Sequence, residues 1–183
     1  REYRIAIQID PEEWMAHSYL GALLAREGNF LHAQEHLEKA IEIRPRHIGS
    51  SDNLYLVHMR LGATDAAIGV AERGIESGLA QLIEFPDDQE ARTHTALLFA
   101  RLGRSEEARE LIKEARENYS KDGFTNFRVA CIYAALGETS DREKAVLELT
   151  AARDRGYHVS GELLGATDLE VLRSLPGFDD LLL

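Results

Sequence analysis

The chain has 183 residues, a hydrophobic fraction of 44% and a formal net charge of −11. That length suits one domain or one modest repeat array, and the apolar fraction is sufficient for a core. The acidic balance excludes the basic footprint that nucleic-acid binding needs, so no nucleic-acid partner is expected. The single cysteine, Cys131, excludes an internal disulfide and favours a reducing, cytoplasmic compartment. The longest strongly apolar run, 129–136, is too short to span a bilayer, so no membrane partner is expected.

The first ten residues are typical of the end of a helix, and they align with residues 37–44 further on. The chain therefore begins in the middle of a pattern, and we interpret it as a fragment of a longer protein. The following Asp-Pro-Glu-Glu segment predicts a helix start. Asp10 is expected to cap that helix and Pro11 to occupy its first position.

Residues 14–47 contain two apolar helical patterns that flank a tight turn at Gly28, and Pro45 ends the second pattern. Glycines recur after helical stripes at intervals of 34, 41 and 34 residues, at Gly28, Gly62, Gly103 and Gly137. A glycine there can take a positive φ, as a short helix–helix turn requires. Five residues beyond the first three glycines, and again twelve beyond them, stand small residues, namely Ala33, Ala67, Ala108, Ala40, Gly74 and Ala115. Small residues there let two antiparallel helices approach closely.

These spacings resemble the tetratricopeptide repeat family, whose helix–turn–helix unit of about 34 residues carries these glycines, alanines and a closing proline. The resemblance implies an all-α fold, a right-handed α-α superhelix of about four helix pairs with C-terminal capping helices. The register predicts a single array over residues 1–183. It comprises the end of a preceding repeat, four repeats and a cap, at 1–13, 14–47, 48–88, 89–122, 123–157 and 158–183. His17 stands where the family often has an aromatic residue.

Two irregularities in the register have a physical explanation. The 41-residue interval contains seven extra residues, which make about two helical turns and keep the apolar face aligned. We therefore predict one long helix from about Asp65 to Phe85. A three-residue insertion follows Gly137, where Ser140 and Glu143 form a capping-box pattern that predicts a last helix starting near Asp141.

In this family the first helices of successive repeats line a concave groove that holds ligand segments. The resemblance implies a partner-binding groove formed by Ser18, Ala22, Arg26, Asp52, Leu56, Arg60, Thr93, Leu97, Arg101 and Phe127. Its mixture of apolar and charged residues suits an extended peptide. Arg26, Arg60 and Arg101 occupy equivalent places and could bind a carboxylate. Alternatively, each arginine could compensate the C-terminal dipole of its own helix, and both interpretations stay open.

A possible metal site lies at His32 and His36, within a match to the H-x-x-E-H pattern of inverted zinc peptidases. Two histidines four residues apart share one helix face and could hold a metal. However, Ala33, Leu37 and Ala40 define the buried stripe, so both histidines are expected near the outer surface, and no third ligand is suggested. The sequence also lacks nucleophile, phosphate-loop and dinucleotide motifs. We therefore expect no catalytic residue, no metal and no cofactor.

The expected function is noncatalytic binding of a peptide or partner protein, as a scaffold or the regulatory part of a larger bacterial signalling protein. The tail from residue 161 resembles the endings of many bacterial tetratricopeptide proteins and would cover the last repeat. One alternative is a self-association module that forms a homo-oligomer. The other alternative is a metal-dependent enzyme that uses His32 and His36.

Overall fold

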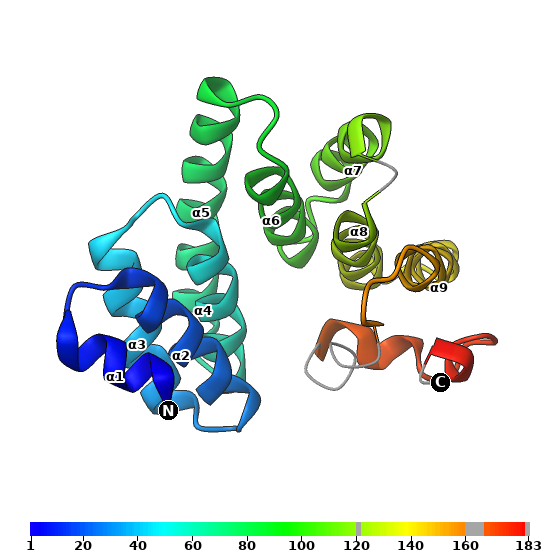
Figure 1. Cartoon of the computed structure of the whole chain (residues 1–183). Helices are drawn as coiled ribbons and strands as arrows, with labels where there is room; N and C mark the ends of the chain where they lie inside the picture. The colour runs from blue at the N-terminus through cyan, green and yellow to red at the C-terminus, as the bar shows by residue number, and fades with distance from the viewer. Residues whose placement is uncertain (120–121, 160–166, 182–183) are drawn as a thin grey trace. The chain divides into compact units, whose positions relative to one another are not determined.

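The computed structural model describes residues 1–119, 122–159 and 167–181, and within them it contains helices and turns but no strand. Figure 1 shows the helices, which are α1 Glu2–Ile9, α2 Trp14–Arg26, α3 Phe30–Ile43, α4 Ile48–Arg60, α5 Thr64–Glu84, α6 Gln89–Arg101, α7 Ser105–Tyr119, α8 Gly123–Leu136, α9 Thr139–Asp154, and the short 3-10 helices η1 Thr167–Leu172 and η2 Asp179–Leu181. The predicted all-α fold class, built from antiparallel helix pairs, is confirmed. The chain divides into two compact units, residues 1–94 and 95–183.

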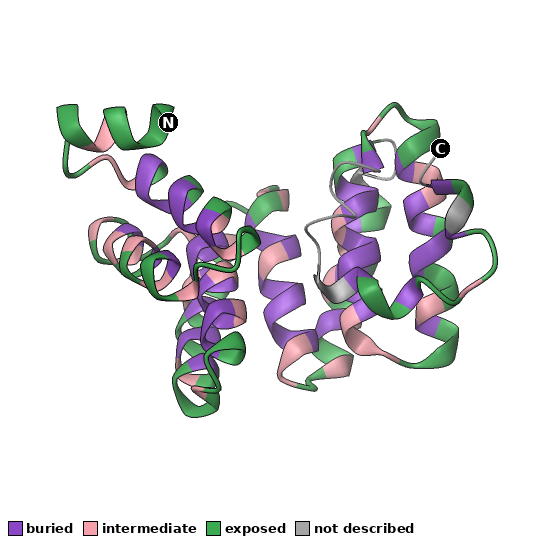
Figure 2. Cartoon of the chain, turned by 90° about the horizontal axis from the view of Figure 1, so that it is seen from below, coloured by how far each residue is buried: buried purple, intermediate pink, exposed green. Residues whose placement is uncertain are grey.

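The first unit is built from helices that are neighbours in sequence. The pairs α2–α3 and α4–α5 each pack together, α3 also packs against α4, and α1 packs against α2. One apolar core joins these helices, formed by Leu20, Leu24, Ala33, Leu37, Leu54, Val57 and Val70. Each fully buried leucine stabilises the fold by about 1.5–3 kcal/mol relative to an exposed one. By contrast, α1 has exposed and half-buried residues but no buried ones (Figure 2).

The turn glycines have the predicted conformation. The φ angles are 79°, 74°, 72° and 77° at Gly28, Gly62, Gly103 and Gly137, all in the left-handed region. The predicted small residues are buried where paired helices meet, and Ala33, Ala67 and Ala108 have no exposed surface. A further glycine, Gly21, permits a close approach of α2 to α3. A Cβ atom added at Gly21 would lie 2.6 Å from Leu37 Cγ and 3.1 Å from the carbonyl oxygen of Ala33.

The long helix predicted over the seven-residue insertion is confirmed as α5, which has 21 residues. Its buried face runs without a break through Ala67, Val70, Ala71, Gly74, Ile75 and Gly78. Polar contacts hold the extra turns: Arg46 Nη1 lies 2.9 Å from Glu84 Oε2, and Gln81 Nε2 donates to Asp88 Oδ2 at 2.6 Å. The last turn is open to solvent, and Ile83 is 84% exposed.

The predicted start of the first complete helix was wrong by several residues. The α2 helix begins at Trp14, and its N-cap is Glu13, whose side chain accepts a hydrogen bond from the Met15 N–H at 3.2 Å. Asp10 instead closes the turn that precedes the helix, because its carboxylate accepts from the Glu12 N–H at 3.0 Å. Pro11 therefore lies in a turn rather than at the first position of a helix.

The capping box predicted for the last helix does not form. The α9 helix begins at Thr139, close to the predicted start, and Glu138 is its N-cap without a side-chain cap hydrogen bond. Ser140 lies inside the first turn rather than at the cap. Asp141, which is fully buried, accepts two hydrogen bonds from Arg109 of α7, at 2.8 and 2.7 Å.

In the second unit α8 packs against both α7 and α9, and the described part of the tail lies against α8 and α9. The 3-10 helix η1 buries Leu169 and Leu172, and the following turn buries Phe178. Residues 160–166 and 182–183 of the predicted cap lie outside the described residues. In the part of the chain that the structure describes, no helix combines the length and the hydrophobicity needed to cross a membrane.

Candidate functional site

In the first unit, α2 and α4, which are the first helices of successive repeats, meet through buried polar side chains that we call the polar seam. Ser50 Oγ of α4 donates to Ser18 Oγ of α2 at 2.9 Å, and it also lies 2.8 Å from Nδ1 of His47. His47 is the N-cap of α4, where its Nδ1 accepts from the Ser50 N–H at 3.2 Å. Ser18 was predicted to line the groove, and its buried side chain here joins two helices.

A second polar contact joins α4 to the beginning of α6. Nδ1 of His94 lies 3.2 Å from Oδ2 of Asp52, whose side chain is buried. The neighbouring Thr93 is also buried and donates from its hydroxyl to the carbonyl oxygen of Gln89 at 2.9 Å. Asp52 and Thr93, both predicted groove residues, therefore expose very little surface to a partner.

The remaining predicted residues of α2 and α4 do reach the surface. Ala22 and Leu56 are half-buried, whereas Arg26 and Arg60 are exposed. Each arginine is the last residue of its helix, and within the described residues neither guanidinium forms a hydrogen bond or an ion pair. Their position fits compensation of the helix dipole, and their unpaired N–H groups fit carboxylate binding.

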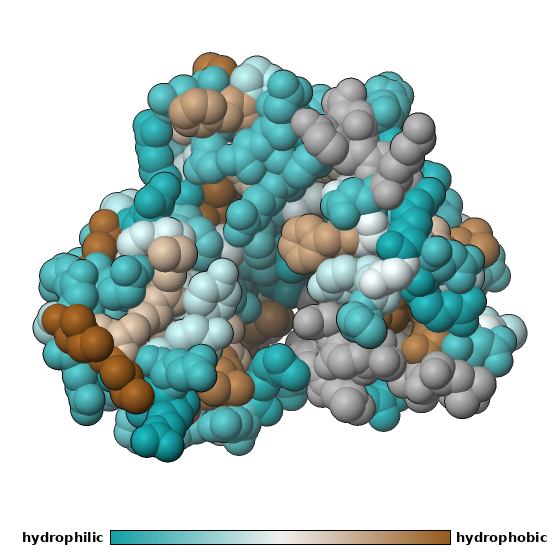
Figure 3. All heavy atoms as spheres, in the orientation of Figure 1, coloured by the Kyte–Doolittle hydropathy of each residue, from teal (hydrophilic) through white to brown (hydrophobic). Residues whose placement is uncertain are grey.

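Exposed apolar residues beside these positions were not predicted. Met15, Tyr19 and Leu23 follow one another at four-residue intervals on the outer side of α2, and Tyr19 is 56% exposed. On the face seen in Figure 3, apolar residues form separate patches among hydrophilic ones. We call the following set the first-helix surface: Tyr19, Ala22, Leu23, Arg26, Leu56, Met59 and Arg60. The sequence does hold a signal for it, because Tyr19 and Leu23 lie off the buried stripe of α2.

The last three predicted groove residues belong to the second unit. Leu97 and Phe127 are buried, and Arg101 is half-buried at the end of α6. The ring of Phe127 packs against that of Tyr157, with 5.2 Å between the ring centroids. Two of these three side chains therefore belong to the core of their own unit.

The histidines of α3 lie differently from one another. His32 is exposed as predicted, and its Nδ1 lies 2.7 Å from Oδ1 of Asn29. His36 is half-buried, because its Nδ1 lies 3.0 Å from Nδ1 of His17, a buried residue of α2. Nε2 of His17 lies 3.2 Å from the carbonyl oxygen of Pro11, which can only accept, so Nε2 donates and Nδ1 accepts from His36. The predicted surface position of His36 was therefore wrong.

Burial, with a smaller contribution from the His17 charge, holds the pKa of His36 below its ordinary value. Within the described ranges no three histidine, cysteine or acidic side chains gather as metal ligands would. The H-x-x-E-H match therefore gains no third ligand from the fold.

An aromatic and cationic cluster, formed by Trp14, His47 and Arg44, lies next to the polar seam at the beginning of α2. The ring of Trp14 lies 4.6 Å from the ring of His47, centroid to centroid, and the Arg44 guanidinium lies 4.8 Å from the Trp14 ring. Cation–π contacts of this kind contribute about 0.5–1 kcal/mol where they are exposed. The cluster brings together the start of α2, the end of α3 and the cap of α4.

Comparison with known proteins identifies the family to which these helix pairs belong. Two family models described as tetratricopeptide repeat match residues 14–47 and 55–123, together more than half of the chain. No curated protein sequence matches it. Similar solved structures include YrrB, described as a TPR protein with an unusual peptide-binding site, at 17% identity over 85% of this chain and 93% of that one, with a TM-score of 0.40. MamA AMB-1 is similar at 18% identity over 94% and 91%, also with a TM-score of 0.40. These matches, together with the helix pairs that the matched residues form, show that the chain belongs to the tetratricopeptide repeat family.

Proposed function

We propose that the chain is a noncatalytic binding module that holds an extended peptide or a segment of a partner protein on the first-helix surface. Membership of the tetratricopeptide repeat family supports a protein-interaction module in general terms. The observation that carries the finer proposal is the combination of exposed Tyr19 and Leu23 with Arg26 and Arg60. Aromatic residues and arginines are the side chains that contribute most at protein interfaces.

The chemistry of this surface favours a partner segment that alternates apolar and acidic side chains. Leu23, Leu56 and Met59 offer apolar area, which is stabilising when a partner removes it from water. The two guanidiniums offer paired N–H donors whose geometry matches a carboxylate. The two guanidiniums place positive charge on this surface of an acidic protein, and that charge, rather than the negative ends of the two helix dipoles, would attract a partner carboxylate. We place this module in the regulatory part of a larger signalling protein.

The test uses short random peptides displayed on phage and selected against the whole chain. Selected peptides are expected to be enriched in acidic and apolar residues. Arg60→Glu and Leu56→Asp should each weaken binding of a selected peptide about tenfold or more, corresponding to about 1.4 kcal/mol, while the helical circular dichroism stays unchanged. The matched control is Arg73→Glu, which makes the same charge change at an exposed position of α5. Full binding by both surface variants would exclude this surface as the site.

A further inference from the structure

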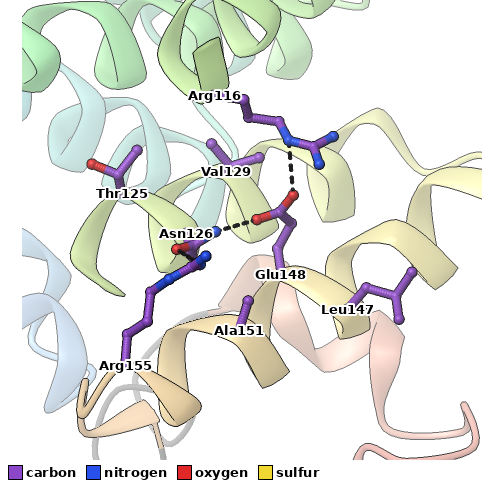
Figure 4. Close-up of a pocket in the computed structure, with 8 residues that line it drawn as sticks. All are labelled: Arg116, Thr125, Asn126, Val129, Leu147, Glu148, Ala151 and Arg155. Carbon is purple, nitrogen blue, oxygen red and sulfur yellow. Dashed lines mark hydrogen bonds and ion pairs between the residues drawn. The ribbon is translucent and has the colours of Figure 1, made fainter. Parts of the chain in front are cut away.

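The second unit contains a pocket that is separate from the first-helix surface. It has a volume of ≈ 200 Å³, and α7, α8 and α9 each contribute to its lining (Figure 4). The polar residues that matter are Arg116 of α7, Asn126 of α8, Glu148 of α9 and Arg155, which follows α9 directly. Apolar side chains, including Val129 and the exposed Leu147, form the remaining wall.

A buried carboxylate and a buried amide anchor this pocket. Glu148 is 7% exposed, and its two oxygens have different partners. Oε2 accepts from Nδ2 of Asn126 at 2.5 Å, and Oε1 lies 3.2 Å from Nε of Arg116. The amide oxygen of Asn126 in turn accepts from Nη1 of Arg155. A buried charge is costly unless it is paired, and this chain of contacts pairs the Glu148 carboxylate and links all four groups.

The two arginines use only part of their hydrogen-bonding capacity. Arg116 binds Glu148 through Nε, so both of its terminal nitrogens remain unpaired within the described residues. Arg155 uses only Nη1, and its side chain is exposed. Two positive charges and one negative charge give the pocket a net charge of +1 inside a chain of net charge −11. Water-accessible donors that are already oriented lose little entropy when a ligand binds.

We propose that this pocket binds a carboxylate, carried by an acidic side chain or by the free C-terminus of a peptide. The single negative charge of a carboxylate balances the net charge of the pocket, whereas a doubly charged phosphate would exceed it. Guanidinium groups bind carboxylates through paired, charge-assisted hydrogen bonds. The volume is smaller than the roughly 300–1,000 Å³ of pockets for whole small molecules, so one residue of a peptide fits better. The exposed side chain of Leu147 would contact the aliphatic part of that residue.

The test uses the full chain labelled with ¹⁵N and small probes that separate the two carboxylate sources. N-acetylglutamate α-amide carries only a side-chain carboxylate, and N-acetylleucine carries only a terminal one. N-acetylleucine amide is the neutral control, and N-acetyllysine amide is the cationic one. At least one carboxylate probe is expected to shift the Nε–H resonances of Arg116 and Arg155, with an affinity in the millimolar range that weakens as salt is added.

Substitutions give opposite expected effects within the pocket. Glu148→Gln keeps an oxygen acceptor but removes the negative charge, so it should raise the affinity for the carboxylate probe about threefold to tenfold. Arg155→Gln should lower that affinity about tenfold. Arg104→Gln, directly before α7 and outside the pocket, should leave that affinity unchanged. Circular dichroism of each variant establishes that it is folded, and the salt dependence is measured on the unaltered chain.

Two outcomes would overturn the proposal. If neither carboxylate probe shifts the arginine resonances of the unaltered chain, the four residues only hold α7, α8 and α9 together. If instead N-acetyllysine amide binds and Glu148→Gln abolishes that binding, the pocket is a cation site formed by Glu148. The peptide experiment on the first-helix surface is independent of both results, because Leu56 and Arg60 belong to the other unit.

Discussion

Replacing Asp141 by asparagine should weaken the attachment of α9 to α7. The Asp141 side chain is fully buried, and each of its oxygens accepts a hydrogen bond from Arg109, at 2.8 and 2.7 Å. Lys144 Nζ adds a third contact at 3.2 Å. An asparagine of the same shape would turn an NH₂ group toward these donors and leave the Arg109 guanidinium without its charge partner.

The expected loss follows from how far each partner is buried. Removing one member of a fully buried ion pair costs about 3–5 kcal/mol, because the other charge stays buried and unpaired. The Arg109 side chain is 28% exposed, so water can recover part of that cost. We therefore expect a loss of about 2–3 kcal/mol, which corresponds to a rise in local opening of about thirtyfold to a hundred and sixtyfold. Hydrogen exchange of α9, followed by mass spectrometry, measures that opening directly.

The destabilisation caused by Asp141→Asn should also depend on pH in a defined direction. The hydrogen bonds from Arg109, helped by Lys144 and opposed by burial, hold the pKa of Asp141 below its ordinary value. The stabilisation is therefore fully present above the unfolded pKa of about 3.9, and it is lost as the pH falls through the lower folded pKa. The difference between the unaltered chain and Asp141→Asn should stay constant from about pH 7 to about pH 5 and shrink below about pH 4.

The control is a second arginine–carboxylate pair, which lies at the solvent-exposed start of α7: Nη2 of Arg104, the residue before α7, lies 2.8 Å from Oε1 of Glu107. Both of these side chains are about half exposed, so Glu107→Gln should leave the hydrogen exchange of α9 unchanged. An Asp141→Asn variant that exchanges like the unaltered chain, or a difference that persists at low pH, would refute the reasoning.

Two further predictions concern the first unit. Gly21→Ala should lower the free energy of unfolding, measured in urea, by about 1–2 kcal/mol, because the new Cβ would meet Leu37 and the backbone of α3. Gly69→Ala should raise it by about 0.5–1 kcal/mol, because its Cβ would meet only the Arg73 side chain, at 3.5 Å. Equal effects of the two substitutions would contradict the close approach at Gly21. His36 should titrate below its ordinary pKa by NMR, so stability should fall as the pH drops from the unfolded pKa toward the folded one. His36→Gln should remove this loss of stability at lower pH. A loss of unchanged size in the variant would show that another titrating group causes it.

Features set by local spacing could be predicted from the sequence. Gly28 and its counterparts need a positive φ at the end of a helix, and that need depends only on the residues next to them. The length of α5 was predictable because seven residues return an apolar face to nearly the same side of a helix. Helix starts were less predictable. Asp10 and Ser140 both have the chemistry of a cap, but the backbone turned into the helix at Glu13 and Glu138 instead.

Polar contacts between helices could not be read from spacing. Ser18 and Ser50 are 32 residues apart, and Asp52 and His94 are 42 apart, so each contact depends on how whole helices pack. The family pattern fixes small and apolar positions but leaves the partner of a polar side chain undetermined. His17 did carry a signal, since a histidine at a position that is often aromatic is expected to be buried. Its contact with His36 explains why that residue left the predicted outer face.

The position of Trp14 has a consequence for spectroscopy. It is the only tryptophan in the chain, and its ring contacts Arg44 and His47 within the first unit. Intrinsic fluorescence excited at the red edge of the absorption band therefore reports on the junction of α2, α3 and α4. Circular dichroism reports on the helices of both units. Recording both signals during one urea titration tests cooperativity without any label: coincident curves mean joint unfolding of the two units, and separated curves mean unfolding in steps.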